Sequence, residues 1–321
     1  MLKRVSIRKI LISLSALFTL FLIYFIPTTN NESLNVNYEL EYVNKDIEKS
    51  VIFLLDSYNM LGRSEVVVLT NKNDIEKRAI ELLNILIQGG SSEDKIPNGF
   101  KAILPSETKI LSLKYDNGLI KVNFSSDILD IDESMEEKMI EAIVYTLTSI
   151  DDVKQIIIYV DGDILSKLPD SKINLPSTLD RSFGINKEYD ITSSRNINMV
   201  TVYYINKYND NYYYVPVSKF VNDDREKIKI IIDSLSSSPI YNNNLMSFLN
   251  YNTKLLSATQ DLDTMSLEFN SYIFSDYDKK KVLEEVIYTI SLSVEDNYDV
   301  NELIFKVDNE EIYKSVFKSL E

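Results

Sequence analysis

The chain lacks the residues on which the commonest catalytic and metal sites depend. Its 321 residues include no His and no Cys. Ser-His-Asp and Cys-His nucleophile systems, the common zinc ligand sets and iron–sulfur clusters are therefore excluded. Disulfides and a lipid-modified N-terminal Cys are excluded as well, so extracytoplasmic domains would depend on their cores alone for stability. We expect no catalytic residues, no metal site and no cofactor.

Serine and lysine could still form a hydrolytic dyad without histidine. Ser-x-x-Lys spacing occurs three times in the sequence. One match is Ser106 with Lys109, a second is at 6–9, before the N-terminal apolar segment, and a third is at 315–318, at the C-terminus. Neither Lys-Thr-Gly nor Ser-Asp-Asn, the companion motifs in penicillin-interacting enzymes, occurs in the sequence. We interpret these matches as chance and predict that the protein is not an enzyme. A hydrolase remains the weakest of three hypotheses.

Four oxygen-bearing residues match part of a calcium-binding loop. Asp130, Asp132, Ser134 and Glu141 fall at positions 1, 3, 5 and 12 of such a loop, but the Gly needed at position 6 is missing. A capping box explains the segment better, because Ser134 would begin a helix and Glu137 follows three residues later. We predict the start of a helix here rather than a metal site.

Tyrosines are concentrated around a predicted hairpin whose turn lies at residues 209–211. Tyr204, Tyr208, Tyr212 and Tyr214 flank this turn. Alternating strand tyrosines usually pack half-buried, and a surface that binds a partner or a glycan is the more specific interpretation. These four residues are the candidate surface, and they motivate the alternative hypothesis of a cell-wall (peptidoglycan) binding module.

A membrane-type segment precedes the rest of the chain. Residues 10–26 are 17 uncharged residues, which is at the short end of what spans a bilayer. Four basic residues precede them and no acidic residue occurs before Glu32, so the positive-inside rule places the N-terminus in the cytoplasm. We predict a cytoplasmic tail (1–9), a transmembrane anchor (10–26) and a linker (27–48). A cleaved signal peptide would look similar, but no small-residue cleavage site follows Ile26.

The net charge argues against one class of partner. The formal charge is −15, and such a chain would be repelled by phosphate. We therefore expect no nucleic-acid partner.

The second half of the sequence repeats the first. An alternating run reaches from Thr108 to Phe124, and another reaches from Thr253 to Phe269, 145 residues later at both ends. Two further matches are 141–147 with 285–290, at an offset of 143 residues counted at their last residues, and 158–161 with 305–308, at an offset of 147 residues. Because the period is the size of a domain, each copy can bury its own core. We predict copy one at 49–183, a linker at 184–197 and copy two at 198–321.

Each copy has the predicted order β, α, β-hairpin, α, β. In copy one the first helix is capped at Asn73 or Asp74, and the hairpin turns at Asn117-Gly118, where both residues need positive φ. The predicted fold class is α+β: two tandem two-layer domains, each with helices on one face of a mainly antiparallel sheet, after an N-terminal transmembrane helix.

These residues resemble the GerM domain family of sporulation and spore germination proteins, as two tandem copies covering nearly all of the chain after about residue 49. The matching segments in copy one are the helix that ends at Gly89-Gly90 and residues 104–109, 122–125, 142–148 and 159–162, followed by a tail at 176–181 and 185–186. Copy two departs from the pattern, with Asn250 where copy one has Pro105 and Asn309 where it has Gly162. Copy one is therefore the better place to seek a surface function.

The resemblance implies assembly rather than catalysis. GerM domains are similar in fold to ring-building domains of secretion systems and sporulation channels, and members are attached to membranes on the extracytoplasmic side. The leading hypothesis is a non-enzymatic, membrane-anchored scaffold of sporulation or germination, with ring formation as one form of it. We expect a single-pass protein of the cell membrane whose bulk lies outside, as in the intermembrane space of a sporulating cell. We expect it to form homo- or hetero-oligomeric protein assemblies, with peptidoglycan as the alternative partner.

Overall fold

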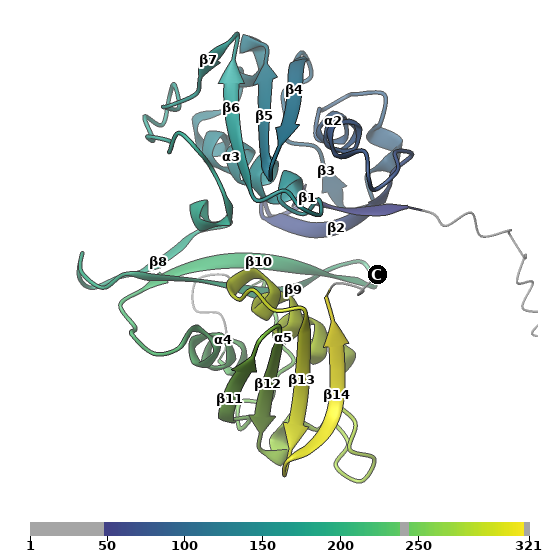
Figure 1. The fold of residues 1–321 in the computed structure, drawn as a ribbon, viewed down its shortest axis with the longest axis vertical. Coiled ribbons are helices and arrows are strands. Elements are labelled where there is room, and N and C mark those ends of the chain that lie inside the picture. The colour runs from purple at the N-terminus through teal and green to yellow at the C-terminus, as the bar shows by residue number, and fades with distance from the viewer. Residues whose placement is uncertain (1–47, 238–243, 318–321) are drawn as a thin grey trace, which may run out of the picture. The chain divides into compact units, whose positions relative to one another are not determined.

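The computed structural model describes residues 48–237 and 244–317, which belong to one compact unit (Figure 1). The predicted tail, the anchor and all but the last residue of the first linker lie outside the described residues. Within the described ranges, no helix is both long enough and apolar enough to cross a bilayer.

Copy one contains two helices and seven strands. The helices are α2 (Ile75–Ile85) and α3 (Glu133–Leu147), and the strands are β1 (Lys49–Asp56), β2 (Leu61–Val67), β3 (Phe100–Lys101), β4 (Ile110–Asp116), β5 (Leu119–Phe124), β6 (Gln155–Val160) and β7 (Asp163–Ile164).

The rest of the chain follows the same plan after a short connecting strand. Its elements are β8 (Glu188–Asp190), β9 (Asn198–Tyr208), β10 (Asn211–Val221), α4 (Lys227–Ser236), β11 (Leu255–Asp261), β12 (Thr264–Phe269), α5 (Glu284–Asn297), β13 (Glu302–Val307) and β14 (Glu310–Val316). The strand β8 lies within the segment predicted as a linker, 184–197.

Each copy has a four-stranded outer sheet. The strand orders are β4-β5-β6-β7 and β11-β12-β13-β14. In each sheet the middle pair is parallel, because α3 or α5 carries the chain back between the two strands, and the outer pairs are antiparallel. Asn117 and Gly118 join β4 to β5 with φ of 46° and 85°. The predicted hairpin is thus confirmed.

The first strands of the two copies form a separate central sheet, which differs from the predicted two-layer plan. The hairpins β1–β2 and β9–β10 meet where β2 pairs with β10 at Arg63 and Tyr214. The sheet runs in the order β3-β1-β2-β10-β8, with β9 also paired to β10. α3 contacts both β1 and β6, and α4 contacts both β9 and β11. Each copy therefore places its helices between an outer sheet and the central sheet (Figure 1).

The helix starts agree with the sequence in one case and differ in the other. Asp74 caps α2, and its side chain accepts a hydrogen bond from the Lys77 amide at 3.2 Å. α3 begins at Glu133, after the N-cap Asp132, so Ser134 lies inside the first turn. The capping box predicted at Ser134 is therefore wrong.

The structure also corrects the alignment of the two copies at their second helices. Thr146 Oγ1 accepts a hydrogen bond from the Phe53 amide at 3.0 Å, and Ser293 Oγ accepts one from the Tyr203 amide at 2.9 Å. These equivalent contacts join the helix to the first strand in each copy, at an offset of 147 residues. The offset of 143 predicted for this helix was about one turn too short. A slip of one turn leaves the apolar stripe on the same face, so periodicity alone could not detect it.

Candidate functional site: the cleft between the two copies

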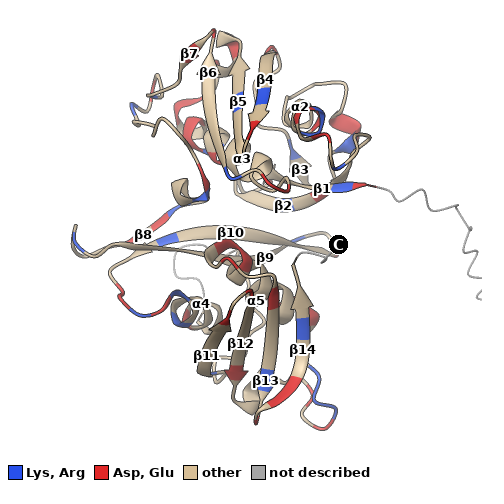
Figure 2. Cartoon of the chain, in the orientation of Figure 1, with Lys and Arg blue, Asp and Glu red and all other residues tan. Residues whose placement is uncertain are grey.

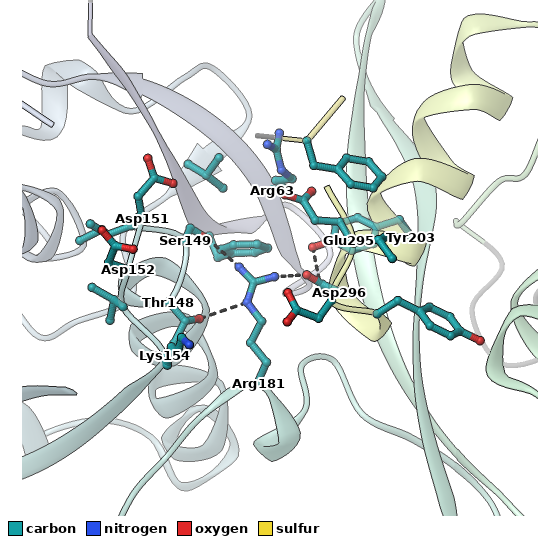
Figure 3. Close-up of a pocket in the computed structure, with 18 residues that line it drawn as sticks. Arg63, Thr148, Ser149, Asp151, Asp152, Lys154, Arg181, Tyr203, Glu295 and Asp296 are labelled. Carbon is teal, nitrogen blue, oxygen red and sulfur yellow. Dashed lines mark hydrogen bonds and ion pairs between the residues drawn. The ribbon is translucent and has the colours of Figure 1, made fainter. Parts of the chain in front are cut away.

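A cleft of about 370 Å³ lies where the two copies meet. Its walls come from the C-terminal end of α3 and the loop after it, and from the end of α5 and the residues that follow. Figure 3 shows Arg181, from the tail of copy one, reaching across this cleft toward Asp296. We take this junction as the candidate site because it gathers the charged side chains that fix the two copies together.

Each of the three nitrogens of the Arg181 guanidinium has a partner in the cleft. Its Nε donates to Thr148 Oγ1 at 3.1 Å, its Nη2 donates to Ser149 Oγ at 2.8 Å, and its Nη1 forms an ion pair with Asp296 (Figure 3). The guanidinium carbon lies 5.0 Å from the centroid of the Tyr145 ring, within the range of a cation–π contact. Arg181 therefore connects the residues after α3 to the end of α5, and its guanidinium is already bound by these partners.

Asp296 accepts from both copies. Its side chain is only 3% exposed, and its second carboxylate oxygen accepts a hydrogen bond from the Tyr203 hydroxyl at 2.9 Å. Burial raises the pKa of Tyr203, and the charge of Arg181 opposes this only in part. Tyr203 therefore keeps its proton and remains a donor to the carboxylate. A buried carboxylate with two partners is stable only while both remain in place.

An aromatic pair lies beneath the arginine. Tyr145 is fully buried, and its ring meets that of Phe53 edge to face at 5.4 Å. Its hydroxyl donates to the Arg181 carbonyl oxygen at 3.2 Å. Burial raises the pKa of Tyr145 to about 12, with Arg181 opposing, so the hydroxyl stays neutral.

Asn186 joins the central strands where their direct pairing stops. Its side-chain amide donates to the carbonyl oxygens of Leu61 at 2.9 Å and Pro216 at 2.8 Å, and its Oδ1 accepts from the Leu61 amide at 2.9 Å. Pro216 has no N–H to offer to the neighbouring strand. The Asn186 carboxamide thus bonds β2 of copy one to β10 of copy two as a peptide unit would.

A buried carboxylate holds Asn186 in place. Glu141 is 2% exposed and accepts from the Asn186 amide at 2.9 Å, with Lys187 Nζ at 3.9 Å. Burial raises the pKa of Glu141 to about 7, while Lys138 and Lys187 oppose the shift. The calcium-loop match at Glu141 has this structural explanation, since α3 carries that residue more than two turns beyond Asp132. Across residues 48–237 and 244–317 no group of acidic side chains has metal-site geometry.

A second polar contact links the copies at the far end of the central sheet. Asp56, at the turn between β1 and β2, is 1% exposed. Its carboxylate accepts from the Tyr213 hydroxyl at 2.8 Å and from the Asn206 side chain at 3.3 Å, both in copy two. The junction is therefore held at two ends.

The four candidate tyrosines do not form one surface. Tyr204 is 1% exposed and lies in the core of copy two, with its hydroxyl 3.5 Å from the Ser234 carbonyl oxygen. A core residue cannot line a binding surface, so its inclusion is corrected. Tyr208 is partly buried against the same core.

The other two tyrosines lie on β10. Tyr212 is 46% exposed, with its ring 5.5 Å from that of Phe248. Tyr214 is half-buried, 5.9 Å from the Tyr288 ring, and burial raises its pKa to about 12. Tyr212 and Tyr214 share a face of the strand because side chains alternate.

Ser106 and Lys109 have no catalytic environment. Both side chains are exposed, and the Lys109 amide donates to Ser125 Oγ at 3.0 Å. A lysine acts as a base when its amine is desolvated. The exposed side chain of Lys109 is in contact with solvent. In the cleft, the polar side chains of Arg181 and Asp296 bond one copy to the other.

Sequence reasoning did not identify Arg181, Asn186 or Glu141 as junction residues. The first two lie in the segments 176–181 and 185–186, which match the tail of the GerM family pattern, so a signal was present. It did not reveal their partners, because Asp296 lies 115 residues from Arg181 and Leu61 lies 125 residues from Asn186.

Comparisons with known proteins agree with the duplicated fold. A family model described as Germane, sporulation and spore germination, matches residues 23–166 and 201–313. The chain is 30% identical to the spore germination protein GerM of Bacillus subtilis (strain 168) over 242 residues. The aligned residues make up 73% of this chain and 65% of that protein. The chain thus spans about two thirds of that relative's length.

A solved structure of the tandem GerMN domains of the sporulation protein GerM from Bacillus subtilis matches with a TM-score of 0.74 and 24% identity, over 82% of this chain and 92% of that one. This likeness shows a shared tandem fold. Since the family model covers most of both copies, the chain belongs to the Germane family of sporulation and spore germination proteins.

Proposed function

We propose that this chain is a non-enzymatic, membrane-anchored assembly protein of sporulation or spore germination. Family membership supports the process. The single observation that carries the assembly role is the buried junction, in which Arg181, Asn186 and Asp56 tie the two copies together. A pair of domains fixed in this way presents its outer sheets as parts of one body, which suits a scaffold.

The edge of the outer sheet in copy two supports the same role. β11 pairs only with β12, so its other edge carries unpaired backbone groups. Leu256 on this strand is 62% exposed, and the one charged or proline residue of β11 is Asp261 at its end, so the edge around Leu256 carries neither. Charged residues and prolines are the usual protection of an edge strand, and an unprotected edge can accept a strand from a partner.

The equivalent edge in copy one is partly closed. The backbone N–H of Tyr115 on β4 donates to the Glu76 carboxylate of α2 at 3.0 Å. β4 also carries Lys114. Copy two therefore offers the better surface for strand addition, contrary to the expectation that copy one would carry the surface function.

The anchoring part of the proposal rests on the sequence. Residues 10–26 are uncharged and follow four basic residues, which fits a single-pass anchor with the two copies outside. Figure 2 shows acidic residues along the ribbon of both copies, in keeping with the charge of −15 and with a protein partner rather than nucleic acid.

The test is crosslinking and affinity purification of tagged full-length protein from membranes of sporulating cells. We expect recovery of a second copy or of another protein of the sporulation machinery. Leu256→Lys should reduce this recovery, and Leu111→Lys, at the matching position of the partly closed edge in copy one, should leave it intact. Recovery of no protein partner, with the chain monomeric, would reject the proposal. Cell-wall material alone would favour the peptidoglycan-binding alternative, for which the exposed Tyr212 is the remaining observation.

A further inference from the structure

A groove lies beside the start of α5 in copy two. It has a volume of about 680 Å³ and is lined by apolar side chains from the helix start and from β14: Val282, Leu283, Ile287, Ile312 and Tyr313. Leu283 is 37% exposed and Tyr313 is 39% exposed. The volume is within the range of sites that bind ligands, roughly 300–1,000 Å³.

The duplication shows what occupies the same place in copy one. At the offset of 147 residues established above, Leu283 corresponds to Glu136 and Ile312 corresponds to Leu165. In copy one the chain leaves β7 after Ile164 and folds back over the start of α3 as a flap of residues 165–175. The Glu136 carboxylate accepts from the amides of Asp170 at 2.9 Å and Ser171 at 2.7 Å, which fastens the tip of the flap to the helix.

The flap is a turn that buries a leucine. Lys167 pairs with Asn174 across it, and the Leu168 amide donates to the Ile173 carbonyl oxygen at 2.9 Å. Leu168 is fully buried in the core of copy one. Leu165 and Leu175, at the two ends of the flap, are buried in the same core, and Leu168 is the most deeply buried of the three. The groove beside α3 is thus filled by the chain's own turn, with Leu168 as its central apolar contact.

Copy two has no such turn among its described residues. β14 continues along β13 from Glu310 to Val316 instead of turning back after two residues as β7 does. The position of Glu136 is taken by Leu283, whose apolar side chain cannot accept a hydrogen bond from a backbone amide as the Glu136 carboxylate does. The equivalent surface is left open.

We propose that the groove beside α5 binds a turn-forming segment of another protein that presents a leucine-type side chain. The occupant is inferred from copy one, where residues 165–175 fill the equivalent site. The proposal rests on the assembly role proposed above and names a surface that role could use.

The rim of the groove fits a segment of mixed charge. The lining also includes the basic residues Lys279, Lys280 and Lys281 and the acidic residues Glu284 and Glu285. Lys280 is paired with Glu310 at 2.7 Å, and Lys279 with Asp276 at 3.4 Å. The copy-one flap with its flanking residues 163–175 also carries both signs, with two Asp and two Lys.

The test uses that segment as the probe. A labelled synthetic peptide with the sequence of residues 163–175 is titrated with the full-length protein in detergent, and binding is followed by fluorescence anisotropy. We expect saturable binding. Leu283→Ser should weaken it about tenfold, because a leucine side chain leaves the contact. The same peptide with Leu168→Ser should lose a similar factor.

Leu262→Ser is the matched control on the protein, since Leu262 is 87% exposed on the turn between β11 and β12, away from the groove. It should leave the peptide affinity unchanged. The proposal is overturned by the absence of saturable binding up to about 1 mM, or by equal affinities for Leu283→Ser and wild type. If the peptide binds while crosslinking in cells recovers no protein, the proposed assembly role is rejected and the proposed peptide-binding groove is retained. If crosslinking recovers a partner while the peptide does not bind, the groove alone fails.

Discussion

Arg181 and Asp296, 115 residues apart in the chain, form an ion pair that ties the tail of copy one to the end of α5. The aspartate is almost fully buried and the arginine is 29% exposed. Thr148, Ser149 and Tyr203 complete the hydrogen bonding of the two groups. Neither copy alone supplies all the partners of this ion pair, so the pair joins the two copies.

Removing the arginine should destabilise the protein. Arg181→Ala leaves Asp296 buried with only Tyr203 as its partner, and we expect the free energy of unfolding to fall by about 2–4 kcal/mol. Arg225→Ala is the control, because Arg225 pairs with Asp223 and Asp233 while 50% exposed. Exposed pairs contribute up to about 1 kcal/mol. Denaturant unfolding of both variants measures the difference, and equal losses would show that the Arg181 pair contributes no more than a surface pair.

The strand bridge made by Asn186 can be tested separately. Asn186→Ala removes the acceptor of the Leu61 amide and the donor to the Pro216 carbonyl oxygen, so we expect a loss of about 2–4 kcal/mol. Asn186 has φ of 46°, and the exposed Asn196 has φ of 54°. Asn196→Ala therefore reports the backbone cost alone, about 1 kcal/mol. Thermal unfolding that shifts by the same amount in both variants would contradict a bridging role.

Glu141 gives the junction a pH dependence of definite sign. Its pKa is raised from 4.5 to about 7 by burial, so the folded state holds the proton more tightly than the unfolded state. Stability relative to Glu141→Gln should therefore fall as pH rises from about 4.5 to about 7 and stay level above that. The full change is on the order of 3 kcal/mol.

The measurement is unfolding of wild type and Glu141→Gln at roughly pH 5 and pH 8. The exposed Glu133, replaced by Gln, is the control on the same helix and should show no such change. A difference between wild type and Glu141→Gln that does not vary with pH would mean that the carboxyl is not buried as described.

The tyrosines of the β9–β10 hairpin should separate by burial. Tyr204→Ala opens a cavity in the core of copy two, and we expect a loss of about 3–5 kcal/mol. Tyr212→Ala removes an exposed ring and should cost less than about 1 kcal/mol. Urea unfolding distinguishes them. If Tyr204 lay on the surface like Tyr212, the two substitutions would lower the free energy of unfolding by similar amounts.

Local signals in the sequence predicted local structure well. Asn117-Gly118 predicted the β4–β5 turn, and the residues matching the GerM pattern identified the family. Asn73 or Asp74 was predicted to cap α2, and Asp74 is the cap. Each of these signals depends on residues that are close together in the sequence, so their conformational preferences can be read from the sequence alone.

Long-range placement could not be predicted in the same way. The strand around Phe53 is equally apolar whether it joins the outer sheet or the central one, so the extra layer was missed. Asp132 and Ser134 are both good caps, and the wrong one was chosen. The alternation that suggested a tyrosine surface did not show which face of β9 the core would cover, and Tyr204 proved buried. The contacts of Arg181 and Asn186 depend on residues more than 100 positions away.

Two glycines with nearly the same backbone conformation test how tightly the copies are packed. Gly99 has φ of 94° and Gly162 has φ of 93°. A Cβ at Gly162 would meet nothing within 4 Å, whereas a Cβ at Gly99 would lie 2.5 Å from the Tyr208 ring. Gly162→Ala should cost about 1 kcal/mol for the backbone alone.

Gly99→Ala should cost about 1–3 kcal/mol more, because the Tyr208 ring must move. Gly99 belongs to copy one and Tyr208 to copy two. Denaturant unfolding of the two variants therefore measures how strongly the junction resists displacement of one copy from the other. If the copies could move apart freely, Tyr208 would yield without cost and the two substitutions would be equally mild. A larger loss at Gly99 would mean that the copies are held together closely enough to act as one body.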